Sequence, residues 1–307
     1  MIKADIYDLP ERTPIDRSTI GKIPRVEDKG RVFDGSTIFR LHGRPVMAYL
    51  ILDEGDLHEI RHAVKTVHVQ KSYRVSGLPT QSSVFGAMPR SGTRTDFCRF
   101  TVASREDTQN MSRMFRFADY LSSIYRHYFP DIYDKALNEV AETVHPDWRI
   151  GKTPFVTCNI NMNHAIKYHY DAGNMRAALS NVLILKRGID GGELVCPEFG
   201  ITLSQRDRAL TIFDGQSILH GVRPIAPRVG SVESYRASIV YYTLYGMKNC
   251  LCAKDEIARI KDVRTAKEHL SKNESRRRVI EVNRGPLSRA GIDPDQLLEK
   301  YKCKNDK

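Results

Sequence analysis

Five short apolar segments, each bounded by glycine or polar residues, follow one another in the C-terminal half of the chain and limit the folds open to it. They are residues 181–188 (NVLILKRG), 191–200 (GGELVCPEFG), 209–215 (ALTIFDG), 217–222 (SILHGV) and 235–246 (YRASIVYYTLYG). Segments of strand length that recur at short intervals with turn signals between them are typical of a β-sandwich or a jelly-roll barrel.

The segment before this series, residues 153–163 (TPFVTCNINMN), alternates strictly between apolar and polar side chains. Its apolar positions are Val156, Cys158, Ile160 and Met162, and its polar positions are Thr157, Asn159, Asn161 and Asn163. A period of two predicts a strand whose second face is unusually polar. That face is either solvated or lines a barrel, where a bound ligand supplies hydrogen-bond partners.

Two histidines and an aspartate suggest a metal site within the predicted strands. His169 and Asp171 lie in YHYDAGN (168–174), and His220 follows the apolar residues of SILHGV. Residues two apart on an extended segment point to the same side. An H-x-D triplet arises easily by chance, but its place among short strands favours the facial triad of a non-haem Fe(II) oxygenase, which leaves coordination positions open.

Arg236 opens the last strand candidate, one hairpin after His220, and Ser238 shares its face. The planar guanidinium of arginine binds a carboxylate in a bidentate manner, and the serine hydroxyl adds a donor. The sequence therefore predicts that Arg236 and Ser238 anchor the far end of a dicarboxylate co-substrate.

The pattern H-x-D, His, R-x-S on short strands, over residues 153–246, resembles the 2-oxoglutarate- and Fe(II)-dependent dioxygenases. Within them it looks like the TET/JBP branch, which oxidises the 5-methyl group of pyrimidines in DNA. The resemblance implies Fe(II), 2-oxoglutarate and O2, with His169, Asp171 and His220 as metal ligands. It also implies that Asn174 contacts a flipped base and that Tyr242 stacks on it. Either Asn159 or Asn161, or their neighbour Asn163, would donate to the keto-acid end of 2-oxoglutarate.

One position departs from the family pattern. The strand RASIVYYTL ends in Leu244, where animal TET proteins carry a base-contacting histidine. We expect 5-methylcytosine as the substrate base, with thymine as the alternative that the missing hydrogen bond allows.

The predicted fold class is α+β, with a double-stranded β-helix (jelly-roll) core and N-terminal helices packed on one sheet. We expect four regions: a loosely structured arm (1–45), a helical support region (46–150), the dioxygenase core (151–247) and a basic helical extension (248–307). Strand candidates within the first two are residues 37–41 and 46–52, and helix candidates are 53–70, 107–129 and 131–144.

Residues 72–99 are rich in Gly, Ser, Thr and Pro and predict a long loop. Arginines among small hydroxyl residues suit phosphate contacts, so Arg90 and Arg94 are candidate DNA ligands; an exposed flexible loop is the alternative. Phe85 and Met88 are candidate wedges for the gap left by a flipped base.

The formal net charge of +11 favours a polyanionic partner such as DNA, although solubility alone also explains a basic protein. No stretch is apolar enough for a signal peptide or a membrane span. The six cysteines are scattered without a second pair for zinc, so we expect free thiols in a reducing, intracellular compartment.

Three alternative functions remain open at this stage. They are a related oxygenase that repairs N-alkylated bases, a protein or small-molecule hydroxylase of the same fold, and a non-enzymatic cupin-like or DNA-binding module. The first typically carries a further arginine after the metal motif, the second needs no DNA affinity, and the third would be indifferent to loss of His169.

Overall fold

The computed structural model describes residues 2–28, 30–73, 79–89, 97–171, 173–176 and 178–268, and in the C-terminal segment 274, 276–277, 280–281, 284 and 293–301. Its larger sheet has the strand order β1-β3-β4-β14-β10-β17-β8-β6-β5, with β7 paired to β6. These strands are β1 (Asp5–Asp8), β3 (Thr37–Leu41), β4 (Arg44–Ile51), β5 (Gln70–Tyr73), β6 (Pro79–Met88), β7 (Arg99–Phe100), β8 (Thr157–Met162), β10 (Ser180–Arg187), β14 (Ala209–Phe213) and β17 (Tyr235–Tyr242).

A smaller sheet lies against the larger one, in the order β2-β13-β12-β15-β9, and β11 pairs with β16 beside it. Their bounds are β2 (Arg31–Phe33), β9 (Ile166–His169), β11 (Ile189–Gly191), β12 (Leu194–Cys196), β13 (Ile201–Leu203), β15 (His220–Val222) and β16 (Ile225–Pro227). A buried apolar cluster joins the facing sides of the two sheets, from Phe39 and Ile184 on the larger to Leu194 and Ile201 on the smaller. Two packed sheets around one core form the predicted jelly roll, and the expected fold class is confirmed.

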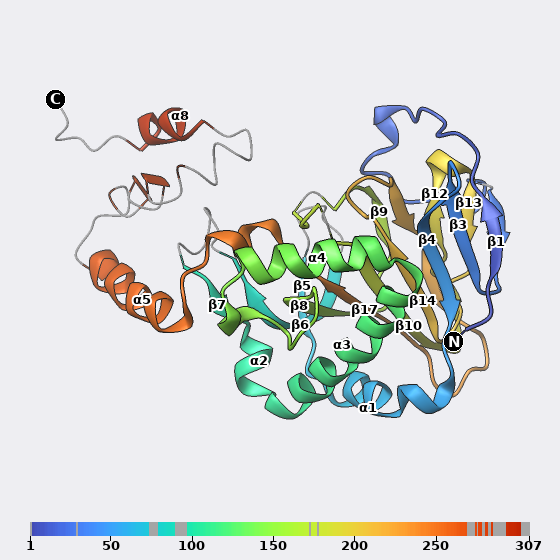
Figure 1. Ribbon diagram of the computed structural model, residues 1–307, viewed down its shortest axis with the longest axis horizontal. Coiled ribbons are helices and arrows are strands. Elements are labelled where there is room, and N and C mark those ends of the chain that lie inside the picture. The colour runs from blue at the N-terminus through green and yellow to red at the C-terminus, as the bar shows by residue number, and fades with distance from the viewer. Residues whose placement is uncertain are drawn as a thin grey trace.

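Helices cover the other face of the larger sheet (Figure 1). The structure describes six helices in all: α1 (His58–Thr66), α2 (Val102–Glu106), α3 (Thr108–Tyr128), α4 (Pro130–Thr143), α5 (Ala253–Glu268) and α8 (Pro294–Glu299). Short 3-10 turns are η1 (Arg17–Thr19), η2 (Glu54–Leu57), η3 (Pro146–Trp148), η4 (Pro197–Phe199) and η5 (Tyr245–Asn249). In Figure 1, α5 lies beyond β7, at the end of the molecule away from β1. None of the helices in the described ranges is long and apolar enough to cross a membrane.

The larger sheet is buried on both faces, which explains why its central strands read as continuous apolar runs. In β10, Leu183 and Leu185 pack toward the helices, whereas Ile184 packs into the barrel. In β8 the predicted alternation holds, because Cys158 and Ile160 join the helix-side core. The opposite face of β8 is therefore the one that faces the barrel interior.

The N-terminal residues differ from the loose arm that we expected. β1 pairs in parallel with β3, and β2 pairs in parallel with β13, so this segment adds a strand to each sheet. Both strands are short and mostly exposed. An edge strand gains its stability largely from backbone hydrogen bonds, so it carries no apolar run by which the sequence would reveal it.

The expected long loop at 72–99 is also wrong in part, because Pro79–Met88 forms β6 and pairs with β8. Its Phe85 is fully buried in the helix-side core, so it is not poised as a wedge, while Met88 is 37% exposed. Gly and Ser within this strand concealed it, because such residues usually signal a loop. Arg90 and Arg94 lie outside the described residues.

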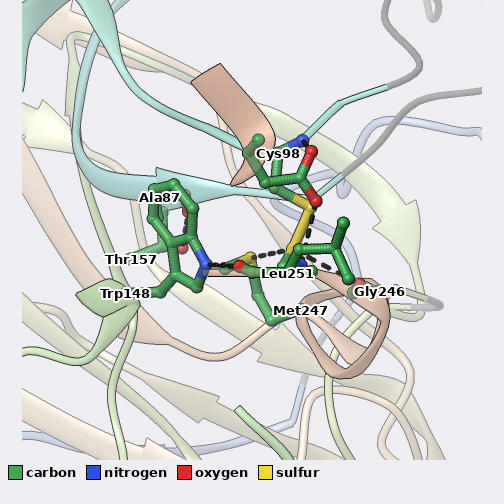
Figure 2. The surroundings of a disulfide bond; sticks show 9 residues. Ala87, Cys98, Trp148, Thr157, Gly246, Met247 and Leu251 are labelled. Atoms are coloured by element: carbon green, nitrogen blue, oxygen red, sulfur yellow. Dashed lines mark hydrogen bonds between the residues drawn. A yellow bond between two sulfur atoms is a disulfide. The ribbon is translucent and has the colours of Figure 1, made fainter. Parts of the chain in front are cut away.

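A disulfide joins Cys98 to Cys250 (Figure 2), whereas the sequence suggested only free thiols. The two residues are 152 positions apart, and only the fold brings them together. Figure 2 shows the bridge close to Trp148, whose Nε1 donates to Leu251 O at 2.7 Å. The buried Glu256 accepts hydrogen bonds from the backbone N–H groups of Cys98 and Leu251. The bridge thus ties the residue just before β7 to the chain that follows β17.

Replacing Cys98 by serine is expected to lower the free energy of unfolding by about 2–4 kcal/mol, because the bridge restricts the unfolded chain over a long loop. Guanidinium denaturation without reductant measures this. Cys252→Ser, which removes an unbridged thiol, is the control and should match the wild type. A reductant should bring the wild type to the level of Cys98→Ser; a wild type indifferent to reductant would contradict the bridge.

Candidate metal centre and active site

The predicted triad comes together at the junction of β9 and β15. His169 ends β9 and His220 begins β15, and the two residues are directly opposite in the antiparallel pair. Their ring centroids are 4.4 Å apart. Asp171 follows two residues after His169, and one ligand atom from each of the three side chains lies within 4.8 Å of the others. The structure therefore brings together the three residues proposed as metal ligands.

Backbone carbonyls orient both imidazole rings. His169 Nδ1 lies 2.9 Å from Lys167 O, and His220 Nδ1 lies 2.9 Å from Ile218 O. A carbonyl oxygen only accepts, so each Nδ1 carries the hydrogen and each Nε2 presents a lone pair. This arrangement is typical of histidines that bind a metal through Nε2.

His220 is held in its neutral form. Burial lowers the pKa of His220 to about 4, and the nearby Asp171 carboxylate opposes this shift only in part. The ring of Phe213 packs edge-on against it, with centroids 4.9 Å apart. A neutral imidazole is the form that ligates a metal, because a protonated ring has no free lone pair.

The Asp171 carboxylate is fixed by its neighbours. Its backbone N–H donates to Gly215 O at 2.8 Å, and Asn174 Nδ2 lies 3.4 Å from Asp171 Oδ2. The other oxygen, Oδ1, lies 3.3 Å from His169 Nε2. A Cβ atom at Gly215 would stand 2.2 Å from Asp171 Oδ2, so only glycine leaves room for the carboxylate. In the sequence this glycine resembles any turn residue, and its role was missed.

A pocket of about 240 Å³ opens beside the triad. Its walls include Asn159, Asn161, Asn174, Ser238 and Tyr242, all predicted site residues. They also include Gln205, which the sequence analysis did not single out. Gln205 is 1% exposed, and its Oε1 has no hydrogen-bond partner within the described ranges.

The register of β8, β17 and β10 sets the order of residues along the barrel-facing side, because residues directly opposite in antiparallel strands share a face. Tyr242, half-buried, stands at the outer end. The successive inner layers are Val240 with Asn159 and Val182, then Ser238 with Asn161 and Ile184, and last Arg236 with Lys186.

Arg236 lies at the inner end of this series and is 2% exposed. Its Nε has no hydrogen-bond partner among the described residues. Burial lowers the pKa of Arg236 to about 10, and Glu193 raises it in part. A Cβ atom at Gly192 would lie 2.8 Å from Arg236 Nε, so this glycine makes space for the side chain. A buried guanidinium with an unmatched donor fits an incoming carboxylate.

Two asparagines lie on β8 and a third follows directly after it, and the three have two different roles. Asn159 and Asn161 line the pocket, and Asn159 Nδ2 lies 3.3 Å from Asn161 Oδ1. Asn159 Oδ1 is buried without a partner in the described part of the chain. Asn163 instead leaves the strand with φ 50° and accepts the Arg236 N–H through Oδ1 at 2.8 Å. It holds the arginine backbone and does not line the pocket.

The donor set fits Fe(II), because two imidazoles and one carboxylate form the facial triad of non-haem iron oxygenases. The buried guanidinium fits the carboxylate of a co-substrate. A jelly roll with these two features defines the class of 2-oxoglutarate-dependent oxygenases.

Comparison with known families places the chain within this class. Residues 88–244, just over half of the chain, match the model described as the oxygenase domain of the 2OGFeDO superfamily. The chain therefore belongs to this family, the Tet_JBP oxygenase domain, and depends on Fe(II) and 2-oxoglutarate as its cofactor and co-substrate.

Among curated relatives, thymine dioxygenase JBP1 of Trypanosoma brucei brucei is 24% identical over 198 residues, covering 64% of this chain and 23% of the relative. Thymine dioxygenase JBP1 of Leishmania major is 34% identical over 173 residues, covering 56% and 21%. The chain thus spans about a fifth of the length of these relatives. The structure of NgTET1 in complex with 5mC DNA has a TM-score of 0.59 at 14% identity, over 84% of this chain and 90% of that one, which supports the fold.

Gly215→Ala is expected to weaken metal binding about 10–100-fold, as disturbed support of a ligand typically does, because the added methyl group displaces the Asp171 carboxylate. Titration with Co(II), a redox-stable substitute for Fe(II), measures this by calorimetry. Gly35→Ala is the control, because no atom lies within 4 Å of the Cβ it adds. Equal Co(II) affinity in the two variants would contradict the assigned geometry.

Proposed function

We propose that the protein hydroxylates the 5-methyl group of a pyrimidine base in DNA, using Fe(II), 2-oxoglutarate and O2. The observation that carries this proposal is the order of groups along one barrel face. His169, Asp171, His220 and Ser238 line one pocket. Arg236 lies two residues from Ser238 on the same face of β17, and its buried Nε has no partner among the described residues.

Each part of the pocket receives a role in this proposal. His169, Asp171 and His220 hold the iron, and Arg236 with Ser238 binds the distal carboxylate of 2-oxoglutarate. Asn161 or Asn159, which lie one and two layers from Arg236 respectively, donates to the keto-acid end. When bound, Fe(II) would activate O2, and the oxidative decarboxylation of 2-oxoglutarate to succinate would supply two of the four electrons that O2 takes up, the other two coming from the C–H bond. The carboxylate anchor lies at the end of β17 opposite Tyr242, so the end with Tyr242 is left for the substrate.

A methyl group inside a duplex is out of reach of such a pocket, so the base must be flipped into it. Tyr242 stands at the mouth and offers a ring on which the base stacks. Asn174 lies beside it, held by a backbone bridge to Leu244.

The formal net charge of +11 supports a DNA partner and hence an intracellular protein. Arg90 and Arg94 are proposed as phosphate contacts from the sequence.

Asn174 presents an acceptor to the base. Its Nδ2 lies 3.1 Å from Ser180 Oγ and 3.4 Å from Asp171 Oδ2. An ionised carboxylate only accepts hydrogen bonds, so the amide nitrogen must face Asp171 and the amide oxygen remains for the base. Thymine offers its N3–H and 5-methylcytosine its N4 amino group. Asn174 therefore serves both bases and does not choose between them.

We propose thymine as the first substrate and 5-methylcytosine as the second, the reverse of the order expected from sequence. Leu244 offers no hydrogen bond where animal TET proteins have a histidine. The relatives named thymine dioxygenase support the same order.

Nucleoside mass spectrometry tests the proposal on duplex DNA that contains thymine, with or without 5-methylcytosine. With Fe(II), ascorbate and 2-oxoglutarate we expect 5-hydroxymethyluracil, together with succinate. His169→Ala or a chelator should abolish both products, whereas His58→Ala, which removes an exposed histidine, should not. Succinate without an oxidised base would point to a protein or small-molecule hydroxylase. The absence of both products would refute the iron site.

Tyr242→Ala is expected to weaken binding of the DNA substrate by about 1–3 kcal/mol, the typical contribution of one base-stacking ring. Tyr242→Phe keeps the ring and should bind nearly as the wild type does. Affinity for 2-oxoglutarate, measured by calorimetry without DNA, should change in neither variant. An alanine variant that binds DNA normally, or that also loses 2-oxoglutarate, would contradict the stacking role.

A further inference from the structure

Two cations lie directly opposite each other on the barrel-facing side of the larger sheet, next to Ser238. Lys186 of β10 is directly opposite Arg236 of β17, so both side chains lie on the face that carries Ser238 and Val240. Arg236 is buried and Lys186 is half-buried. Like charges directly opposite in a sheet repel each other. Such a pair is costly unless an anion lies between or beside its members.

The protein itself supplies only part of that compensation. Lys186 Nζ donates to Gly191 O at 3.1 Å, which leaves two of its three hydrogens for other acceptors. Glu193 raises the pKa of both cations, but within the described ranges neither cation is ion-paired with a carboxylate. Burial, and then the charge of Arg236, lower the pKa of Lys186. The two strands therefore bring together two cations without an ion-paired carboxylate among the described residues, and Arg236 Nε has no partner there.

We infer that Lys186 is a second anchor for the distal carboxylate of 2-oxoglutarate, opposite Arg236. The inference rests on the proposed function and extends it to a residue that no sequence motif indicates. A carboxylate accepts about four hydrogen bonds through its two oxygens. The Arg236 fork and the Ser238 hydroxyl approach from β17, and the Lys186 ammonium approaches from β10. An anion held between the cations also removes their mutual repulsion, so the site selects a dicarboxylate over a monocarboxylate.

Two variants separate this role from a structural one. Lys186→Gln removes the charge but keeps a donor for Gly191 O, whereas Lys186→Met removes both. The dissociation constant for 2-oxoglutarate is measured anaerobically on the Fe(II)-loaded protein, by calorimetry and by the charge-transfer absorption of the complex. Both variants should bind 2-oxoglutarate about tenfold more weakly, as expected for the loss of a charge-assisted hydrogen bond. Affinity for Co(II) should not change.

The control is Arg187→Gln, which removes the same charge from the next residue of β10. Arg187 points to the opposite face, is exposed, and contacts Glu233. It should bind 2-oxoglutarate as the wild type does. A second ligand, 2-oxovalerate, has the same chain length without the distal carboxylate. The preference for 2-oxoglutarate over 2-oxovalerate should shrink about tenfold in Lys186→Gln and stay constant in Arg187→Gln.

Each other outcome is decisive. If Lys186→Gln binds 2-oxoglutarate like the wild type, the inference is wrong. If only Lys186→Met binds more weakly, and binding of 2-oxoglutarate and 2-oxovalerate falls equally, Lys186 acts by holding the Gly191 turn. The inference is then also wrong. If the wild type loaded with Fe(II) binds no 2-oxoglutarate, the proposed function itself fails and this inference fails with it.

Discussion

The alternation of side chains along β17 is the constraint on which the site and the fold both depend. Ala237, Ile239 and Tyr241 are fully buried against the helices, whereas Arg236 and Ser238 face the barrel. A slip of one residue would place the guanidinium among apolar side chains and the Tyr241 ring in the pocket. Because the strand lies between β10 and β8 in the larger sheet, the same slip would break two ladders at once.

Contacts at both ends of β17 oppose such a slip. At the outer end, Tyr241 donates its hydroxyl to Met114 O at 2.8 Å and packs against Phe117 and Phe155. At the inner end, Asn163 accepts the Arg236 N–H through its side chain and donates its own N–H to Arg236 O. The helix-side core thus sets the position of Arg236, the proposed co-substrate anchor, although none of its described residues lines the pocket.

Much of the site was predictable because its residues obey short-range rules. The H-x-D spacing, the R-x-S spacing and the polar face of β8 each follow from the period of an extended strand. The residues that were missed depend on contacts between distant segments. Gly215 and Gly192 matter only for the space they leave beside Asp171 and Arg236, and a turn glycine gives no sign of its neighbour.

The disulfide, Lys186 and the edge strands β1 and β2 were missed for related reasons. The pairing of Cys98 with Cys250 requires a folded chain, and Lys186 gains a role only from the register that sets it against Arg236. The strands β1 and β2 lie at sheet edges with exposed side chains, so hydrophobic patterning does not reveal them. Sequence reasoning was strongest for residues whose spacing within one strand places them together. It was weakest for residues whose neighbours come from another part of the chain.

The N-terminal segment shows why a missed region matters for the site. The strand β9, which carries His169, is only four residues long and lies at the edge of the smaller sheet. Tyr168 exchanges backbone hydrogen bonds with this segment, through Gly21 N–H and Lys22 O, and its hydroxyl donates to Asp28. A strand so short has few ladder bonds of its own to resist fraying. Because His169 is the next residue, the segment that was expected to be loose holds His169 in register with His220, the other histidine of the proposed metal site.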